Sequence, residues 1–205
     1  RYLFQQYINA PDSVYEHVYK LAPGAILKFQ NGQIETWNYW SVREAYGEAA
    51  KRPVKSYGEA KERLKALLQR AVSLRMIADV PLGTFLSGGY DSSLVTAMAQ
   101  AHSAESVKTF SIGFFEDNYN EAPYARAVAD YLGTSHTELM IDETDMLRMV
   151  ESIPQYYDEP FADPSQIPTM LVCKLAREQV TVALSGDGGD EFYCGYNIYE
   201  KVAQA

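Results

Sequence analysis

The sequence contains few of the residues on which disulfide frameworks and metal centres depend. Its two cysteines, Cys173 and Cys194, lie far apart and form no Cys-x-x-Cys pattern. They are too few for a disulfide framework, so we expect reduced thiols, as in a cytoplasmic protein. The three histidines are scattered without metal-ligand spacing, and we expect them to lie in packed or surface positions.

Long apolar runs and clusters of basic residues are also missing. No apolar run approaches the length that crosses a bilayer, so we expect no membrane partner. The sequence has 18 Lys and Arg residues against 27 Asp and Glu residues, which gives a formal net charge of −9, and it has no basic run. Affinity for a phosphate backbone comes from clustered Lys and Arg, so we expect no nucleic acid partner and favour a small-molecule substrate.

The stretch from residue 80 to residue 99 predicts a strand, a glycine loop and a helix in that order. A short apolar run ends at Leu86, Gly88 and Gly89 follow, and apolar residues recur at helical spacing from Leu94. We expect the helix to begin around Asp91–Ser93, whose side chains can accept hydrogen bonds from the N–H groups of a first turn. The two glycines let main-chain N–H groups surround an anion at the positive end of the helix dipole, and phosphate suits such a site.

This glycine loop needs a cation to hold a phosphate. It lacks the lysine of the Gly-x-x-x-x-Gly-Lys-Ser/Thr loop, and its glycines do not fit the Gly-x-Gly-x-x-Gly pattern. The carboxylate of Asp91 would repel a phosphate unless a divalent cation lay between them, and Mg²⁺ commonly binds one or two carboxylates together with phosphate oxygens. The loop therefore predicts a nucleotide and Mg²⁺. The alternative is a plain strand-to-helix turn in which Asp91 caps the helix.

The seven residues Ser87–Ser93 carry a resemblance to a known loop. Their sequence, Ser-Gly-Gly-Tyr-Asp-Ser-Ser, resembles the pyrophosphate loop Ser-Gly-Gly-x-Asp-Ser-Ser of the N-type ATP pyrophosphatases. Those enzymes cleave ATP to AMP and pyrophosphate, so the resemblance implies that the nucleotide is ATP.

The first part of the chain predicts a small β-rich piece that follows a short helix within residues 1–8. Apolar and polar residues alternate over 18–21, 25–29 and 33–37, and Asn31-Gly32 between the last two predicts a hairpin. The chain begins at Arg1 with neither an initiator methionine nor a signal peptide, so we expect it to be part of a longer protein. We expect this piece to be the edge of a preceding domain.

From residue 60 onward the pattern is that of an α/β protein. The periodicity fades between residues 40 and 53, where we place a domain boundary, and no element is predicted there. After it, strands alternate with helices, which implies a doubly wound, mostly parallel sheet. The predicted helices cover residues 60–72, 122–132, 144–153 and 166–179, and the predicted strands after the glycine loop cover 108–114, 137–141 and 180–184.

A second glycine loop, Ser185–Glu191, follows the strand at 180–184 and again combines glycines with carboxylates. Ligands of open α/β sheets bind beyond the carboxyl ends of the strands, so the two loops should converge on one Mg–nucleotide site. The alternative for this loop is a surface turn rich in Gly and Asp.

Most of the chain resembles one family. Residues 1–40 resemble the end of a class II glutamine amidotransferase domain, and residues 55–205 resemble the synthetase domain of glutamine-hydrolysing asparagine synthases. Besides the two loops, the segments 110–114, 121–126, 132–136 and 158–165 fit that family. The resemblance implies the end of an Ntn-type glutaminase domain with its linker over 1–45, and over 55–205 the first part of an adenine nucleotide alpha-hydrolase-like (PP-loop) domain.

The resemblance also implies roles for individual residues. It places Asp187 at the position where the reaction intermediate forms, although many members carry glutamate there. Tyr90 replaces a usual aliphatic residue, and Phe192–Tyr196 depart from Leu-Phe-Gly-Gly-Tyr, so the acceptor is less defined than ATP. The implied ligands are Leu86 and Ile112 for adenine; Ser87, Gly88, Gly89, Asp91, Ser92 and Ser93 for the phosphates; Ser185 and Gly186 for the nucleotide; and Asp91 and Asp190 for Mg²⁺.

The implied reaction is the ATP-dependent conversion of aspartate to asparagine through β-aspartyl-AMP. Ammonia would come from glutamine, and a homodimer is compatible with the full-length protein. The family's glutaminase nucleophile is an N-terminal cysteine, and its synthetase site uses a lysine beyond residue 205, so these residues alone should not complete the synthesis. Related enzymes that act on another carboxylate, tRNA thiolation or lysidine formation, and a silent nucleotide-binding module are the competing interpretations.

Overall fold

The computed structural model describes residues 2–116 and 120–203. Their contacts divide the chain into two compact units, which are described separately. The first comprises Arg1–Lys61 and Ser152–Pro164, and the second comprises Glu62–Glu151 and Ser165–Ala205.

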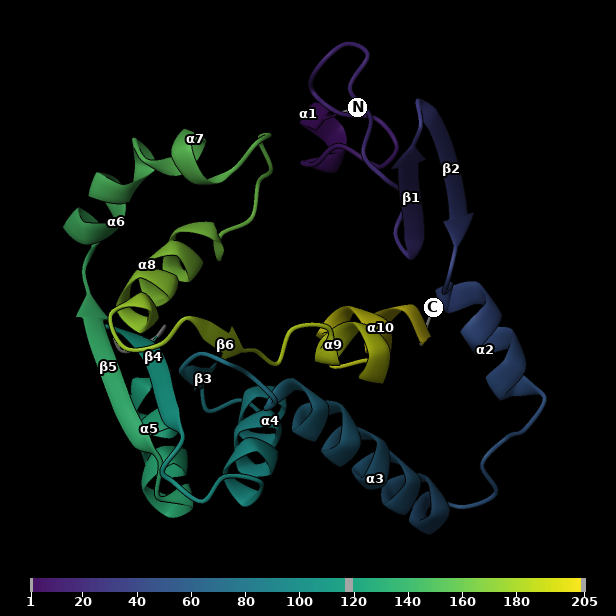
Figure 1. The fold of residues 1–205 in the computed structure, drawn as a ribbon. Coiled ribbons are helices and arrows are strands. Elements are labelled where there is room, and N and C mark those ends of the chain that lie inside the picture. The colour runs from purple at the N-terminus through teal and green to yellow at the C-terminus, as the bar shows by residue number, and fades with distance from the viewer. Residues whose placement is uncertain (1, 117–119, 204–205) are drawn as a thin grey trace. The chain divides into compact units, whose positions relative to one another are not determined.

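The first unit is built around the predicted hairpin. Strands β1 and β2 pair antiparallel, with Gln30 opposite Gln33, and the turn residues Asn31 and Gly32 have φ values of 53° and 76°. Both angles are positive, as the tightest hairpin turn requires, so the Asn-Gly prediction is confirmed. The elements of this unit are α1 (Tyr2–Gln5), β1 (Ala25–Gln30), β2 (Gln33–Asn38), α2 (Val42–Ala50), the start of α3 (Tyr57–Arg75) and α7 (Ile153–Tyr156) (Figure 1).

The predicted strand at 18–21 is wrong, whereas the short helix predicted within residues 1–8 is present as α1. Residues 18–21 form no strand because tertiary contacts hold this segment as a loop: the Lys20 N–H donates to the Pro11 carbonyl at 2.8 Å, and the Lys20 ammonium pairs with Glu159. Helix α1 ends at Gln5, because Gln6 takes the left-handed conformation with φ 66°.

The second unit contains a four-stranded sheet with the order β5-β4-β3-β6. Every neighbouring pair of strands is parallel, which confirms the predicted α/β class. The strands are β3 (Leu82–Phe85), β4 (Lys108–Phe114), β5 (Ser135–Ile141) and β6 (Val182–Leu184). The helices, after the main part of α3, are α4 (Tyr90–Ala101), α5 (Ala122–Leu132), α6 (Glu143–Val150), α8 (Gln166–Arg177), α9 (Gly189–Tyr193) and α10 (Asn197–Ala203).

Side chains alternate between the two faces of the central strands, and those on both faces are buried. Helices therefore cover both faces of this sheet. Phe110 of β4 is fully buried and packs with Ala176 and Val180 at the α8 face. On the opposite face, Leu86 packs against α5, and the fully buried hydroxyls of Thr84 and Thr96 lie 2.9 Å apart between β3 and α4. The strand that precedes the first glycine loop is therefore fixed to the helix that follows it.

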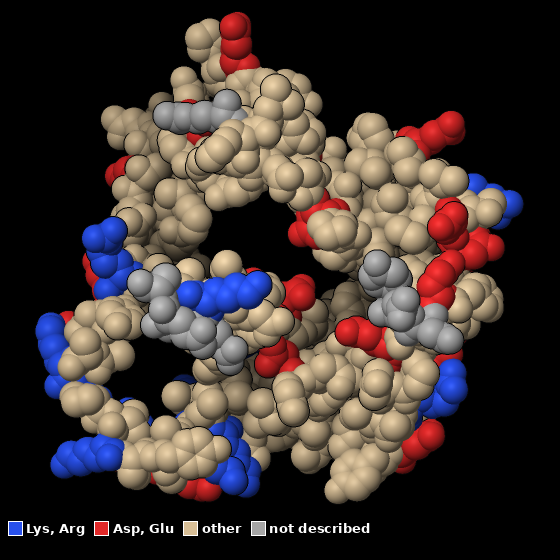
Figure 2. Space-filling view, turned by 180° about the vertical axis from the view of Figure 1, so that it is seen from behind, with Lys and Arg blue, Asp and Glu red and all other residues tan. Residues whose placement is uncertain are grey.

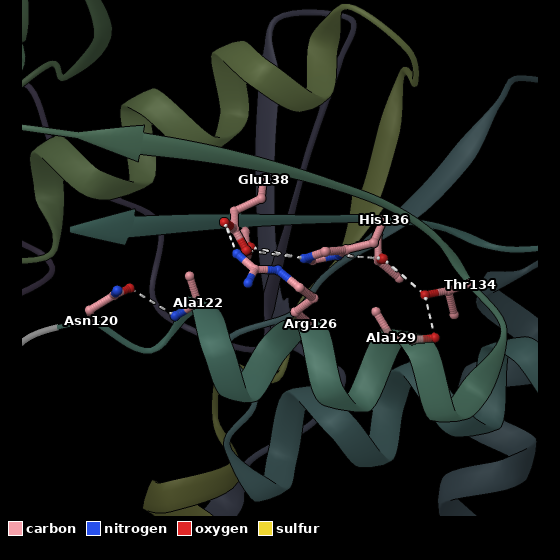
Figure 3. Close-up of polar contacts among 9 residues, drawn as sticks. Asn120, Ala122, Arg126, Ala129, Thr134, His136 and Glu138 are labelled. Atoms are coloured by element: carbon pink, nitrogen blue, oxygen red, sulfur yellow. Dashed lines mark hydrogen bonds and ion pairs between the residues drawn. The ribbon is translucent and has the colours of Figure 1, made fainter. Parts of the chain in front are cut away.

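A polar network fixes α5 to the edge of the sheet, as Figure 3 shows. Arg126 of α5 donates to Glu138 of β5 at 2.5 Å. His136 lies between hydroxyls of β4, with its Nδ1 2.9 Å from Thr109 Oγ1 and its Nε2 3.2 Å from Ser111 Oγ. Burial lowers the pKa of His136, and the nearby Glu138 carboxylate partly opposes that effect. This histidine thus has a structural environment, as expected from the sequence.

None of the helices in the described part of the chain combines the length and the hydrophobicity that a bilayer crossing requires.

Candidate functional site

The first glycine loop leads directly into helix α4. Gly89 is the N-cap residue, with φ −69° and ψ 166°, and Tyr90 is the first helical residue. Asp91 and Ser92 therefore occupy the first turn, close to where the sequence predicts the helix start. Asp91 does not cap the helix, so the capping role that the alternative interpretation gave to Asp91 is wrong. The N–H groups of the first turn have no partner within the helix and point beyond its end.

Serine hydroxyls hold the shape of this loop. The Oγ atoms of Ser87 and Ser92 lie 2.9 Å apart, and the Ser87 N–H donates to Ser92 Oγ at 3.2 Å. The Gly89 N–H donates to Ser87 Oγ at 3.3 Å. These bonds connect the loop to the first turn of α4.

Gly88 fits only because it lacks a side chain. Its φ is 86°, and a Cβ atom there would lie 2.6 Å from Tyr124 Cβ and 2.7 Å from the Ala125 nitrogen. Both residues belong to the first turns of α5. Gly88 thus joins the loop to α5 and faces that helix rather than the cavity described below.

The second glycine loop lies against the first. Strand β6 pairs with β3, so the loops that follow these strands leave the sheet side by side. A Cβ atom on Gly186 would lie 2.8 Å from the Ser92 nitrogen, and one on Gly189 would overlap the Asp91 carboxylate. Gly195, just beyond the loop, has the same relation to Asp190. The two loops converge, as their parallel strands predict.

A cavity of about 730 Å³ opens between the two loops. The loop residues that the sequence assigns to a site and that line this cavity are Ser87, Gly89, Asp91, Ser92, Ser185, Gly186, Asp187 and Asp190. The other lining residues are Phe85, Tyr90, Glu121, Thr169, Val172, Gly189, Tyr193 and Gly195. The cavity therefore extends from both loops to the start of α5 and to the first two turns of α8.

Four of the predicted site residues do not line this cavity. Leu86 is 1% exposed and packs with Ala125 and Ala129, so its side chain is closed to a ligand. Ile112 lies within β4, half-buried, and Gly88 faces α5. The Ser93 hydroxyl is buried and has no hydrogen-bond partner among the described residues.

The cavity wall is strongly negative. Asp91, Glu121, Asp187 and Asp190 contribute carboxylates, whereas no Lys or Arg lines the cavity among the residues that the structure describes. Partial burial raises the pKa of Asp91, and repulsion from Asp190 and Glu191 raises it further. A cation between Asp91 and Asp190 would relieve this repulsion.

The carboxylates of Asp91 and Asp190 suit Mg²⁺ better than they suit a metal ion that is held entirely by protein side chains. Across residues 2–116 and 120–203, no three His, Cys, Asp or Glu side chains gather in a way that could hold a metal ion. Mg²⁺ bound by one or two carboxylates takes its remaining ligands from water and phosphate oxygens. The donor set of Asp91 and Asp190 is therefore compatible with Mg²⁺ that arrives with a nucleotide.

Three side chains of the second loop have hydrogen-bond partners of their own. Tyr196 donates its hydroxyl to Glu191 at 2.7 Å. This bond lowers the pKa of Glu191 and raises the pKa of Tyr196 to about 12. Ser185 donates its hydroxyl to Asp187 at 3.1 Å, which orients the predicted catalytic carboxylate toward its own loop.

Charges are dispersed over the visible surface. On the face shown in Figure 2, the blue Lys and Arg side chains form separate patches and do not merge into one basic surface. This distribution agrees with the acidic composition of the sequence.

Sequence reasoning missed Glu121, Thr169 and Val172 as cavity residues. Glu121 is the N-cap of α5, and Thr169 and Val172 lie in the first and second turns of α8, so only the packing of α5 and α8 brings them to the cavity. Glu121 does begin the segment 121–126, which fits the family pattern. That fit was the signal in the sequence that could have identified Glu121 as a cavity residue.

A family model and the sequences of curated relatives indicate one family. A family model described as asparagine synthase matches residues 63–205. Over 193 residues the chain is 39% identical to a protein of Methanocaldococcus jannaschii that is provisionally named asparagine synthetase [glutamine-hydrolyzing] 2, covering 93% of this chain and 36% of the relative. Over 204 residues it is 34% identical to asparagine synthetase [glutamine-hydrolyzing] 1 of Bacillus subtilis, covering 98% and 31%. The chain thus spans about a third of the length of these relatives.

Among solved structures, one similar fold is that of the NH3-dependent NAD synthetase of Campylobacter jejuni. The TM-score is 0.46 at 12% sequence identity, and the match covers 66% of this chain and 60% of that one.

Proposed function

The chain belongs to the asparagine synthase family, and from this premise we propose that the cavity between its two glycine loops binds Mg-ATP in a glutamine-hydrolysing asparagine synthetase. The observation that carries the proposal is the contact between the loops, in which Gly186 and Gly189 lie against the first turn of α4. Asp91 and Asp190 belong to different loops and would hold Mg²⁺ together.

In the proposed reaction, the side-chain carboxylate of aspartate attacks the α-phosphorus of ATP. The bond to the β-phosphate oxygen breaks, and β-aspartyl-AMP and pyrophosphate form. Ammonia then attacks the acyl carbon and AMP leaves, which gives asparagine. When bound, Mg²⁺ would neutralise charge on the departing pyrophosphate.

The chain's own groups would act mainly by preorganised electrostatics. The first-turn N–H groups of α4 and the hydroxyls of Ser87 and Ser92 would donate to phosphate oxygens. Asp187 would orient the acceptor or accept a proton from the incoming ammonia, and its bond to Ser185 holds it at the cavity wall.

The predicted contact between Leu86 and adenine can involve only the main chain of that residue. The Leu86 side chain is buried and its N–H donates to the Phe110 carbonyl at 2.9 Å, so contact with adenine would have to use the main-chain carbonyl. Ser93 and Gly88 would support the phosphate-binding loop from outside the cavity. Ile112 would contribute through its main chain within β4.

The same proposal covers the domain organisation, the substrates, the cellular location and the partners of the protein. Residues 1–45 would be the end of a glutaminase domain with its linker, and residues 55–205 would be the first part of the synthetase domain. Aspartate and glutamine would be the substrates of a cytoplasmic enzyme, with no nucleic acid partner and with a homodimer compatible with the whole protein.

Exchange of labelled pyrophosphate into ATP tests this proposal in the full-length gene product that carries residues 1–205. We expect exchange that requires both aspartate and Mg²⁺. Exchange with another acid but not with aspartate would indicate a relative that acts on a different carboxylate. ATP binding without exchange under any acid would indicate a silent nucleotide-binding module and would reject the enzymatic proposal.

A further inference from the structure

The segment Ser152–Pro164 packs with the first unit, although the residues on either side of it belong to the second unit. It lies within residues 55–205, the part proposed to be the synthetase domain, whereas the rest of the first unit is the N-terminal piece of the chain, residues 1–61. Helix α6 precedes the segment and helix α8 follows it. The chain therefore leaves the second unit, contacts the N-terminal piece and then returns to the second unit.

Lys20 anchors this segment to the N-terminal piece. The Lys20 ammonium pairs with the Glu159 carboxylate and also donates to the Ile8 carbonyl at 2.5 Å. The side chains of Lys20 and Glu159 are 33% and 25% exposed, so salt screens this ion pair less than it screens a pair on the open surface. Three residues further along, the Ala162 N–H donates to the Gln6 carbonyl at 2.8 Å. Residues 159–162 are thus held by both charged and main-chain groups of residues 6–20.

The anchored segment leads directly into helix α8. Ser165, the residue that follows the segment, is the N-cap of α8. Thr169 and Val172, in the first two turns of this helix, line the cavity between the glycine loops. A helix transmits a displacement of its first residue to its following turns, because its hydrogen-bonded backbone is rigid. The position in which Glu159 is held can therefore affect the cavity wall through the start of α8.

We propose that Lys20 is a positioning residue for the synthetase cavity, because its ion pair with Glu159 fixes the segment that sets where α8 begins. This inference rests on the proposed function, in which that cavity binds Mg-ATP. It gives a residue of the proposed glutaminase end a role in substrate binding by the synthetase part. Displacements of about 1 Å that arise far from the reacting atoms can lower rates strongly, so the ion pair need not touch a substrate to matter.

The test uses Lys20→Met in the full-length gene product, which removes the ammonium group and keeps an unbranched side chain. ATP–pyrophosphate exchange measures the synthetase site alone, because it needs aspartate and ATP but no glutamine. We expect the KM for ATP, for aspartate or for both to rise roughly 3- to 10-fold. A smaller folded fraction would lower only the apparent kcat, so the KM values separate positioning from a purely structural role.

Lys51→Met is the matched control, because Lys51 forms an ion pair with Glu48 in the same unit and both side chains are mostly exposed, at 69% and 68%. It should keep both KM values, since exposed pairs contribute little. Glu159→Gln removes the other charge of the anchoring pair at constant size and should raise the same KM as Lys20→Met. It also provides the test if Lys20→Met does not fold.

The double variant of Lys20→Met with Glu159→Gln should show no larger KM than the more affected single variant, because both changes remove one interaction. Unchanged KM values in the single variants would overturn the inference and leave the proposed function intact. Additive effects of the two changes would also overturn it, since the two side chains would then act separately. No exchange in the wild type with any acid would reject the proposed function and this inference together.

Discussion

Gly189 and Asp91 lie so close that a Cβ atom on the glycine would overlap the aspartate carboxylate. Gly189 has no left-handed backbone conformation, so it is required for this close approach and not for a turn. The carboxylate of the first loop therefore lies where the second loop leaves room for it. The two glycine loops depend on each other through this contact.

Gly189→Ala tests that dependence. Its methyl group should displace the Asp91 carboxylate, and we expect the Kd for ATP with Mg²⁺ to rise about tenfold or more without loss of the fold. Gly58→Ala is the matched control, since Gly58 lies in α3 with open space around it. Calorimetric titration measures both variants, and equal affinities would show that the contact has no functional role.

The adjacent glycines of the first loop should respond differently to substitution. Gly88→Ala meets both a positive φ and the main chain of α5, so we expect a loss of stability of roughly 1–3 kcal/mol. At Gly89 the φ is −69° and the nearest atom to an added Cβ is Ser87 Oγ at 3.4 Å. Gly89→Val should therefore keep the fold but obstruct the phosphate cradle. Urea unfolding separates these outcomes, and equal stability of the two variants would refute the assignment of Gly88.

The hydroxyl pair of Thr84 and Thr96 should stabilise the connection from β3 to α4. Each hydroxyl is buried and has the other as its partner at 2.9 Å. Thr84→Val leaves Thr96 unpaired and should cost about 1–3 kcal/mol, whereas the double variant with valine at both positions should lose less than the sum of the single variants. Additive losses in a double-mutant cycle would mean that the two hydroxyls do not interact.

The free energy of unfolding should fall as the pH drops below about 6.5, the ordinary pKa of histidine, because of His136. Its folded-state pKa is lowered by burial, so the unfolded chain binds more protons, and the stabilising contribution is present above a pH of about 6.5 and lost below it. Unfolding free energies measured between about pH 5 and 8 should show this slope. His136→Gln should reduce the slope, and an unchanged slope would assign it to other groups.

Strongly patterned elements of this chain are predictable from its sequence. The strand at 108–114 and the helix at 122–132 are confirmed with the predicted bounds, because β4 is buried on both faces and α5 has Pro123 at its start and a left-handed Gly133 at its end. Helix α2 was missed although Ser41 accepts from the Glu44 N–H at 3.1 Å. The Ser-x-x-Glu signature was present there, but the apolar periodicity used to find helices was weak.

The site is predictable only where it lies within the loops. Loop convergence follows from parallel strands, so Asp91 and Asp187 line one cavity as expected. The burial of Leu86 does not follow, because it depends on the packing of that side chain against Ala125 and Ala129 of α5. Glu121 could not be predicted as a cavity residue either, because only the packing of α5 beside the loops brings it there.

The most direct test of the Mg-ATP site is the calorimetric affinity for ATP of the full-length gene product, in Mg²⁺ and in chelator, for the wild type and Asp91→Asn. The wild type should bind ATP at least about tenfold more tightly in Mg²⁺, because the carboxylates of Asp91 and Asp190 otherwise repel the phosphates. Asp91→Asn should lose most of that difference, since it removes both a metal ligand and a repulsive charge. Equal affinity of the wild type in Mg²⁺ and in chelator would contradict the assignment of the two loops to a Mg–nucleotide site.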